Sequence, residues 1–144
     1  MAYNLFVDSD ILLDVILNRK PFVDHSLELF IQRADETIQL FTSSSIIINT
    51  QYIGEKQIGI SLTKTGMKKL LKYLDIINPE KQTIIEAYDS RFIDVEDAIQ
   101  YFTALQNKSI EYFITRNSKD YTKYSNSSLP VLTPFQFLRS IKSI

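Results

Sequence analysis

The chain has no cysteine, one histidine, three glycines and four prolines among its 144 residues. The absence of cysteine excludes disulfides, thiolate nucleophiles and cysteine-ligated zinc, and it is compatible with a reducing compartment. The few glycines and prolines argue against flexible linkers and low-complexity segments. No apolar run approaches the roughly 18 residues that cross a bilayer, and the N-terminus lacks the basic stretch and apolar core of a signal peptide. We therefore expect a soluble, cytoplasmic protein with no membrane partner.

Charge of neither sign dominates, because 16 Lys and Arg stand against 17 Asp and Glu. The molecule is not a polycation, so any nucleic acid would have to bind to a local patch. A hydrophobic content of 44% with 12% aromatic residues excludes a disordered chain. The length fits one domain, and we expect residues 1–144 to form it.

Short apolar or β-branched runs alternate with segments of helical periodicity. The runs cover 3–8, 37–43, 111–115 and 129–134, with a weaker one at 73–78. Helical spacing occurs at 10–18, 24–35, 97–105 and 134–141; the apolar face predicted for 24–35 consists of Leu27, Phe30, Ile31 and Ala34. This alternation predicts an α/β domain with three α/β/α layers and a mostly parallel sheet of about five strands. Such sheets bind ligands at the carboxyl ends of their strands.

The first predicted strand ends at Asp8, and Asp10 and Asp14 follow on one face of the next helix. A strand that ends in Asp-x-Asp is a recurring arrangement in metal sites. In the other interpretation Asp8 or Ser9 caps the helix, and Asp10 interacts with the positive end of its dipole. Both interpretations stay open.

Two further junctions between a strand or loop and a helix carry carboxylates. Asp94 and Asp97 lie three residues apart at the start of the helix at 97–105, where they would equally serve as an N-cap and a first-turn acid. Asn117 and Asp120 follow the strand at 111–115, where a turn residue and a solvated acid are the alternative. The fold would bring all three junctions to the same edge of the sheet.

Carboxylates gathered at one place repel one another, and a divalent cation relieves that repulsion. With oxygen ligands, no cysteine and a single histidine, Mg²⁺ or Mn²⁺ fits better than zinc or copper. His25 lies in a helical segment away from every strand end and is interpreted as a surface or capping residue. The sequence has no nucleophile elbow, dinucleotide-binding motif or P-loop. The residues therefore favour a Mg²⁺ or Mn²⁺ site.

Four segments in order carry a likeness to a known family: LFVDSDILLDVILNRKPF (5–22), DVEDAIQYFTAL (94–105), YFITRNSKDY (112–121) and LPVLTPFQFL (129–138). Together they resemble the PIN domain, the nuclease fold of many bacterial toxin–antitoxin ribonucleases. The resemblance implies a Mg²⁺- or Mn²⁺-dependent endoribonuclease that acts on RNA. It implies that Asp8 and Asp97 are the main metal ligands, flanked by Asp94, and that Asn117 and Asp120 complete the catalytic cluster. It also implies a homodimer and an antitoxin partner that fills the acidic cleft.

One position departs from the family pattern. Many members have a glutamate in the helix after the second strand, where SSSIIINTQYIGEK (43–56) has Asn49. Glu55 does not substitute for it, because six residues correspond to roughly 240° around a helix. The loss of this negative charge keeps a second hypothesis open, in which a PIN-like module binds RNA or a protein without cutting.

An RNA substrate would need cations near the acidic pocket. Arg19 ends the first helix, and Arg116 and Lys119 flank Asn117, so these three are the expected substrate-binding residues. Exposed aromatic side chains would serve a partner interface, and the candidates are Tyr52, Tyr121 and Tyr124. Buried or isolated surface tyrosines are the alternative at each position.

A second enzyme hypothesis rests on LFVDSDIL (5–12), which also resembles the opening Asp-x-Asp motif of haloacid-dehalogenase-like phosphatases. Asp8 would then be a covalent nucleophile and Asp10 an acid or base. The chain is short for that family, and the segment FITRNSKDY (113–121) has no role in it. The nuclease is therefore the leading hypothesis.

Overall fold

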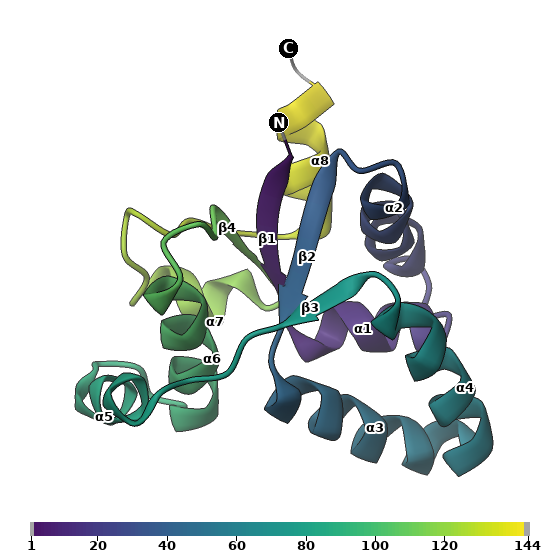
Figure 1. Ribbon diagram of the computed structural model, residues 1–144, viewed down its shortest axis with the longest axis horizontal. Helices are drawn as coiled ribbons and strands as arrows, with labels where there is room; N and C mark the ends of the chain where they lie inside the picture. Colours follow the sequence, from purple (N-terminus) through teal and green to yellow (C-terminus); the bar gives the residue numbers. More distant parts are fainter. Residues whose placement is uncertain (1, 143–144) are drawn as a thin grey trace.

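A computed structural model describes residues 2–142 of the chain. Within these residues five strands form one sheet, in the order β3-β2-β1-β4-β5 (Figure 1). The strands are β1 (Tyr3–Val7), β2 (Ile38–Thr42), β3 (Leu74–Ile76), β4 (Tyr112–Ile114) and β5 (Val131–Leu132). Every neighbouring pair is parallel. This confirms the predicted α/β fold, and it places the carboxyl ends of all the strands along one edge.

Helices cover both faces of the sheet. In Figure 1, α2 and α4 lie on one side of the strands, and α5, α6 and α7 lie on the other. The helices are α1 (Ser9–Ile16), α2 (Val23–Ala34), α3 (Ser44–Ile58), α4 (Ile60–Leu71), α5 (Lys81–Asp89), α6 (Val95–Gln106), α7 (Ser118–Thr122) and α8 (Pro134–Lys142). None of the helices between residues 2 and 142 has the length and hydrophobicity of a bilayer-spanning segment.

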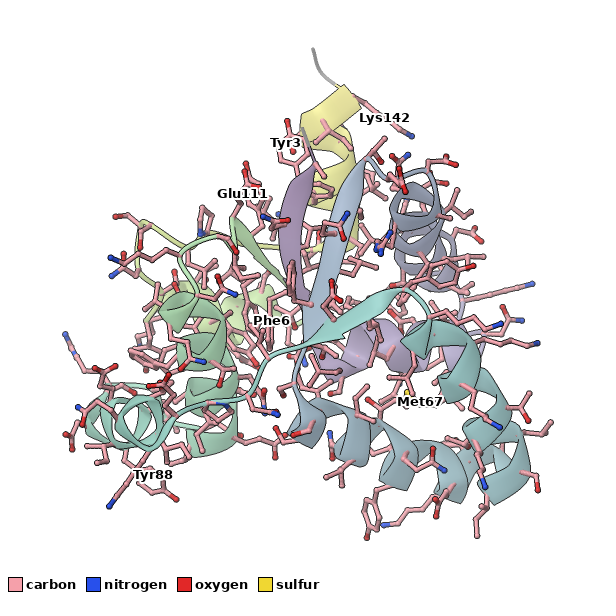
Figure 2. All side chains as sticks on the ribbon, viewed as in Figure 1. Tyr3, Phe6, Met67, Tyr88, Glu111 and Lys142 are labelled. Atoms are coloured by element: carbon pink, nitrogen blue, oxygen red, sulfur yellow. The ribbon has the colours of Figure 1, made fainter. Side chains whose placement is uncertain are left out.

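The central strand β1 is buried on both faces. Leu5, Phe6 and Val7 are fully buried, and Phe6 lies at the middle of the sheet (Figure 2). A parallel strand covered on both sides reads as a continuous apolar run, which is why this segment was recognisable in the sequence. The run stops at Asp8, so the first polar side chain lies where the strand reaches the edge.

The inward face predicted for the segment at 24–35 is wrong in part. Leu27 and Ile31 are 42% and 46% exposed, and Ala34 is also exposed, whereas Phe30 is buried as predicted. Helix α2 instead buries Val23, Ser26, Leu29 and Phe30. The cause is a polar residue on the inward side: the Ser26 hydroxyl donates a hydrogen bond to a buried carboxylate of α1.

Candidate functional site

Asp8 is both a helix cap and a member of a polar cluster at the edge of the sheet. Its Oδ1 accepts from the backbone N–H of Ser9 at 2.8 Å and so caps α1. Its Oδ2 accepts from the Tyr121 hydroxyl at 3.0 Å and from Thr115 Oγ1 at 3.3 Å. The two interpretations of Asp8 are therefore compatible, because each uses a different oxygen.

Asp97 reaches the same place from α6. Asp94 is the N-cap of α6 and accepts from the backbone N–H of Asp97 at 3.1 Å, which leaves the Asp97 side chain free of the cap. Asp97 Oδ1 accepts from the Tyr121 hydroxyl at 3.1 Å. One hydroxyl from α7 thus contacts carboxylates from the end of β1 and the start of α6.

The protonation behaviour of the cluster reflects burial and repulsion. Burial, followed by repulsion from Asp10, raises the pKa of Asp8 from 3.8 to about 7. Burial and then repulsion from Asp94 raise the pKa of Asp97 to about 6. Burial and the nearby carboxylates raise the pKa of Tyr121 well above its ordinary value, so its hydroxyl stays protonated and donates. Near pH 7 the Asp8 carboxyl is therefore partly protonated, and a bound cation would displace that proton.

Asp10 lies beside these groups, and only one of its two carboxylate oxygens accepts hydrogen bonds from residues 2–142. Its Oδ2 accepts from the backbone N–H of Arg116 at 3.0 Å and from Thr115 Oγ1 at 3.2 Å. Its Oδ1 is buried and has no hydrogen-bond partner within the described residues. Burial raises the pKa of Asp10 as well. An unpartnered buried carboxylate oxygen at this position suits a bound cation or water.

Asp14 has a structural role. It is fully buried; its Oδ1 accepts from Arg19 Nε at 3.1 Å, and its Oδ2 from Arg116 Nε at 2.8 Å and Ser26 Oγ at 3.0 Å. We refer to Asp14, Arg19, Ser26 and Arg116 as the Asp14 clasp. The clasp joins α1, the loop after it, α2 and the segment after β4. The two arginine side chains keep 35% and 23% exposure, so they also reach solvent.

The remaining acidic candidates gather around a cavity of about 380 Å³. Asp94, Asp97 and Asp120 line it together with the cations Lys119 and Lys123. Asn117 precedes α7 and is exposed; its backbone N–H donates to Thr115 Oγ1 at 3.1 Å. The structure therefore brings the residues of the three predicted junctions into one region.

Asn49, where a family glutamate was expected, also faces this edge. It is half-buried in α3, and its Nδ2 lies 3.5 Å from Ser9 Oγ. Between residues 2 and 142, no three or more Asp, Glu or His side chains form a ready-made metal site. His25 packs on Phe135 at 5.1 Å between ring centroids, as a surface residue would.

The three tyrosines predicted as interface candidates differ in exposure. Tyr52 is 58% exposed and Tyr124 is half-buried. Tyr121 is 1% exposed, which agrees with the alternative of a buried tyrosine and removes this residue from the interface candidates. Its hydroxyl instead joins Asp8 to Asp97, a role that the sequence did not indicate.

The sequence matches the family model of the PIN domain over residues 4–119. The chain belongs to the PIN-domain family. The match covers the junctions at Asp8, Asp97 and Asn117 and ends one residue before Asp120. It decides between the two resemblances at the first junction, in favour of the PIN domain and against the phosphatase.

Solved structures share the fold of this PIN domain at low sequence identity. VapBC2 from Rickettsia felis, bound to a DNA fragment from their promoter, has a TM-score of 0.69 and 16% identity, over 90% of this chain and 98% of that one. PAE2754 from Pyrobaculum aerophilum has a TM-score of 0.65 and 13% identity, over the full length of both chains. No curated protein matches the sequence.

Proposed function

We propose that residues 1–144 form one PIN nuclease domain that hydrolyses RNA phosphodiester bonds with Mg²⁺ or Mn²⁺ as its cofactor. The observation that carries the proposal is the convergence of Asp8 and Asp97 on one buried hydroxyl at the carboxyl edge of the sheet. PIN domains are generally nucleases, and ligands of open α/β sheets bind at this edge.

The donor groups fit a hard divalent cation. All of the candidate ligand atoms are oxygens, and burial together with neighbouring carboxylates raises the pKa values of Asp8 and Asp97, an effect that a bound cation would offset. The buried Oδ1 of Asp10 has no protein donor. Mg²⁺ keeps several waters and needs only one or two carboxylates together with substrate phosphate, so a preformed cage of three is not required.

Each residue then has a stated role. Asp8 and Asp97 would hold the cation, with Asp94 and Asp120 nearby. When bound, the cation would supply an activated water and positive charge for the phosphate. Asn117 orients the water through its side-chain amide, and Lys119, on the wall of the same cavity, binds the RNA backbone.

The other two expected substrate-binding residues have a first role in folding, because Arg19 and Arg116 both donate to Asp14. Because both arginine side chains are still partly exposed, we retain them in the proposal as residues that contact the RNA backbone. A planar guanidinium with unused N–H groups binds phosphate well.

We further propose that this domain is the toxin of a toxin–antitoxin pair and forms a homodimer. The support for the toxin role is the likeness in fold to VapBC2 from Rickettsia felis, and the homodimer is what the resemblance to PIN-domain toxins implies. The side chain of Tyr52, which is 58% exposed on α3, is a candidate contact for either partner.

A second function is favoured by one observation, the neutral Asn49 at the edge of the site. With fewer carboxylates the domain would bind RNA or a protein without cutting it. Titration calorimetry with Mn²⁺ separates the two functions. A domain that binds RNA but shows no heat with millimolar Mn²⁺ would be a binding module.

Cleavage of single-stranded RNA tests the nuclease directly. The wild type should cut in the presence of Mn²⁺ and stop when EDTA is added, and Asp8→Asn and Asp97→Asn should each remove activity. Asp35→Asn is the matched control, because Asp35 is an exposed carboxylate before β2, at the opposite edge of the sheet. Equal cleavage with EDTA, or by Asp8→Asn, would refute the proposal.

A further inference from the structure

The packing of the Tyr121 ring fixes where its hydroxyl lies. The ring centroid is 4.6 Å from that of Phe113 in β4, 6.0 Å from that of Phe92 and 6.4 Å from that of Tyr101 in α6. A side chain that is 1% exposed and contacts rings from several segments has little rotamer freedom. The core therefore presets the position of the hydroxyl.

Two carboxylates share this one hydroxyl. The phenol oxygen lies 3.0 Å from Asp8 Oδ2 and 3.1 Å from Asp97 Oδ1. A phenol carries a single hydrogen, so it donates to one of the two at a time. The hydroxyl thus keeps the Asp8 and Asp97 carboxylates close together although they repel each other. Because it donates to only one of them at a time, a lone pair on the facing oxygen of the other carboxylate stays available.

We propose that Tyr121 is a positioning residue, whose hydroxyl keeps the carboxylates of Asp8 and Asp97 turned toward one another so that a divalent cation binds them together. The inference rests on the proposed function, because it takes these carboxylates as ligands. Tyr121 lies outside residues 4–119, which match the family, so the assignment comes from the contacts of this chain. Groups that orient ligand side chains commonly change metal affinity 10- to 100-fold when they are removed.

The substitution Tyr121→Phe deletes the hydroxyl and keeps the ring. Tyr101→Phe is the matched control, because Tyr101 is also 1% exposed and packs in the same cluster, while its hydroxyl donates to the backbone carbonyl of Leu129 at 2.8 Å. The two variants differ in whether the lost hydroxyl faces carboxylates.

The readout is the Kd of Mn²⁺, measured by titration calorimetry, together with the electron paramagnetic resonance spectrum of bound Mn²⁺. We expect Tyr121→Phe to raise the Kd by about 10- to 100-fold and to change the spectrum, whereas Tyr101→Phe keeps both. In RNA cleavage, Tyr121→Phe should raise the Mn²⁺ concentration needed for half-maximal rate and leave kcat at saturating Mn²⁺ near the wild-type value.

Three results would overturn the inference. The first is a wild-type Kd in Tyr121→Phe, which leaves the proposed function intact. The second is an equal loss of affinity in Tyr101→Phe, or a kcat of Tyr121→Phe that saturating Mn²⁺ does not restore, because either assigns the effect to packing of the core. The third is a wild-type protein that binds no Mn²⁺, which also removes the proposed function.

Discussion

Replacing Asp8 with asparagine should stabilise the metal-free protein at alkaline pH and abolish its response to Mn²⁺. Asparagine caps helices as well as aspartate does, so the bond from the Ser9 N–H to residue 8 is kept. With the amide oxygen on the cap, the amide nitrogen takes the place of Oδ2 and donates to the Tyr121 oxygen, whose own hydrogen then goes to Asp97. The substitution therefore removes the charge at this position and keeps a hydrogen bond to Tyr121.

The size of the effect follows from the raised pKa of Asp8. The folded protein binds this proton with a pKa of about 7, against 3.8 for the ordinary group. Since the folded state binds the proton more tightly, the wild type loses stability as the pH rises from about 4 to about 7. The full difference corresponds to about 4 kcal/mol. Because Asp8 is partly exposed, we expect Asp8→Asn to gain about 2–3 kcal/mol at pH 8 and less than about 1 kcal/mol at pH 4.

Thermal and urea unfolding in EDTA, followed by circular dichroism, measures this difference. A gain of 2–3 kcal/mol corresponds to a rise in Tm of about 5–10 °C for a chain of this length. With millimolar Mn²⁺ at pH 8 the wild type should become more stable by mass action, and Asp8→Asn should not. A variant that is less stable than the wild type at pH 8, or that gains equally at pH 4, would refute the reasoning; Asp35→Asn should show neither effect.

Three other changes test the Asp14 clasp, the packing of α3 on α4, and the lysines of the cavity that Asp97 and Asp120 line. Asp14→Ala removes the acceptor of two guanidinium groups and of the buried Ser26 hydroxyl; because the arginines reach solvent, it should lower the free energy of unfolding by about 1–3 kcal/mol. A wild-type urea midpoint would contradict this. Gly54→Ala places a Cβ 2.5 Å from Thr63 Cγ2 and should cost about 1–3 kcal/mol in the same assay, whereas no loss would mean that α3 and α4 separate freely. Replacing Lys119 and Lys123 with glutamine should reduce the slope of log affinity against log salt for single-stranded RNA by about 1.4, as measured by fluorescence anisotropy. An unchanged slope would place the RNA elsewhere.

The strands were predictable because each is a short apolar run at the place where the sheet needs one. The run at 37–43 became β2 (Ile38–Thr42) and the run at 111–115 became β4 (Tyr112–Ile114). Only Val131–Leu132 of the run at 129–134 form a strand, because β5 is the outermost strand of the sheet and pairs with β4 alone. Helix α5 gave no signal, since its buried positions are Thr83 and Ala87 and a small or polar inward face has no apolar period.

The site was predictable as far as chain position decides it. Asp8 and Asp97 stand at junctions that a parallel sheet brings to one edge, so topology alone indicated them. The role of Tyr121 was not predictable from the sequence. Its hydroxyl bonds to Asp8 and Asp97 span 113 and 24 positions of the chain, and no local spacing encodes contacts of that kind. The buried Ser26 was missed for the same reason, because its acceptor lies on another helix.

The Asp14 clasp affects how a mutational scan of this protein would have to be interpreted. Arg19 and Arg116 lie next to the acidic edge and would score as essential in any screen for lost cleavage. Their guanidinium groups neutralise a carboxylate that has no exposure to solvent, so most substitutions there would first lower the amount of folded protein in the cell. Only a scan that measures the abundance of each variant together with its activity would separate a loss of nucleic-acid binding from a loss of folded protein.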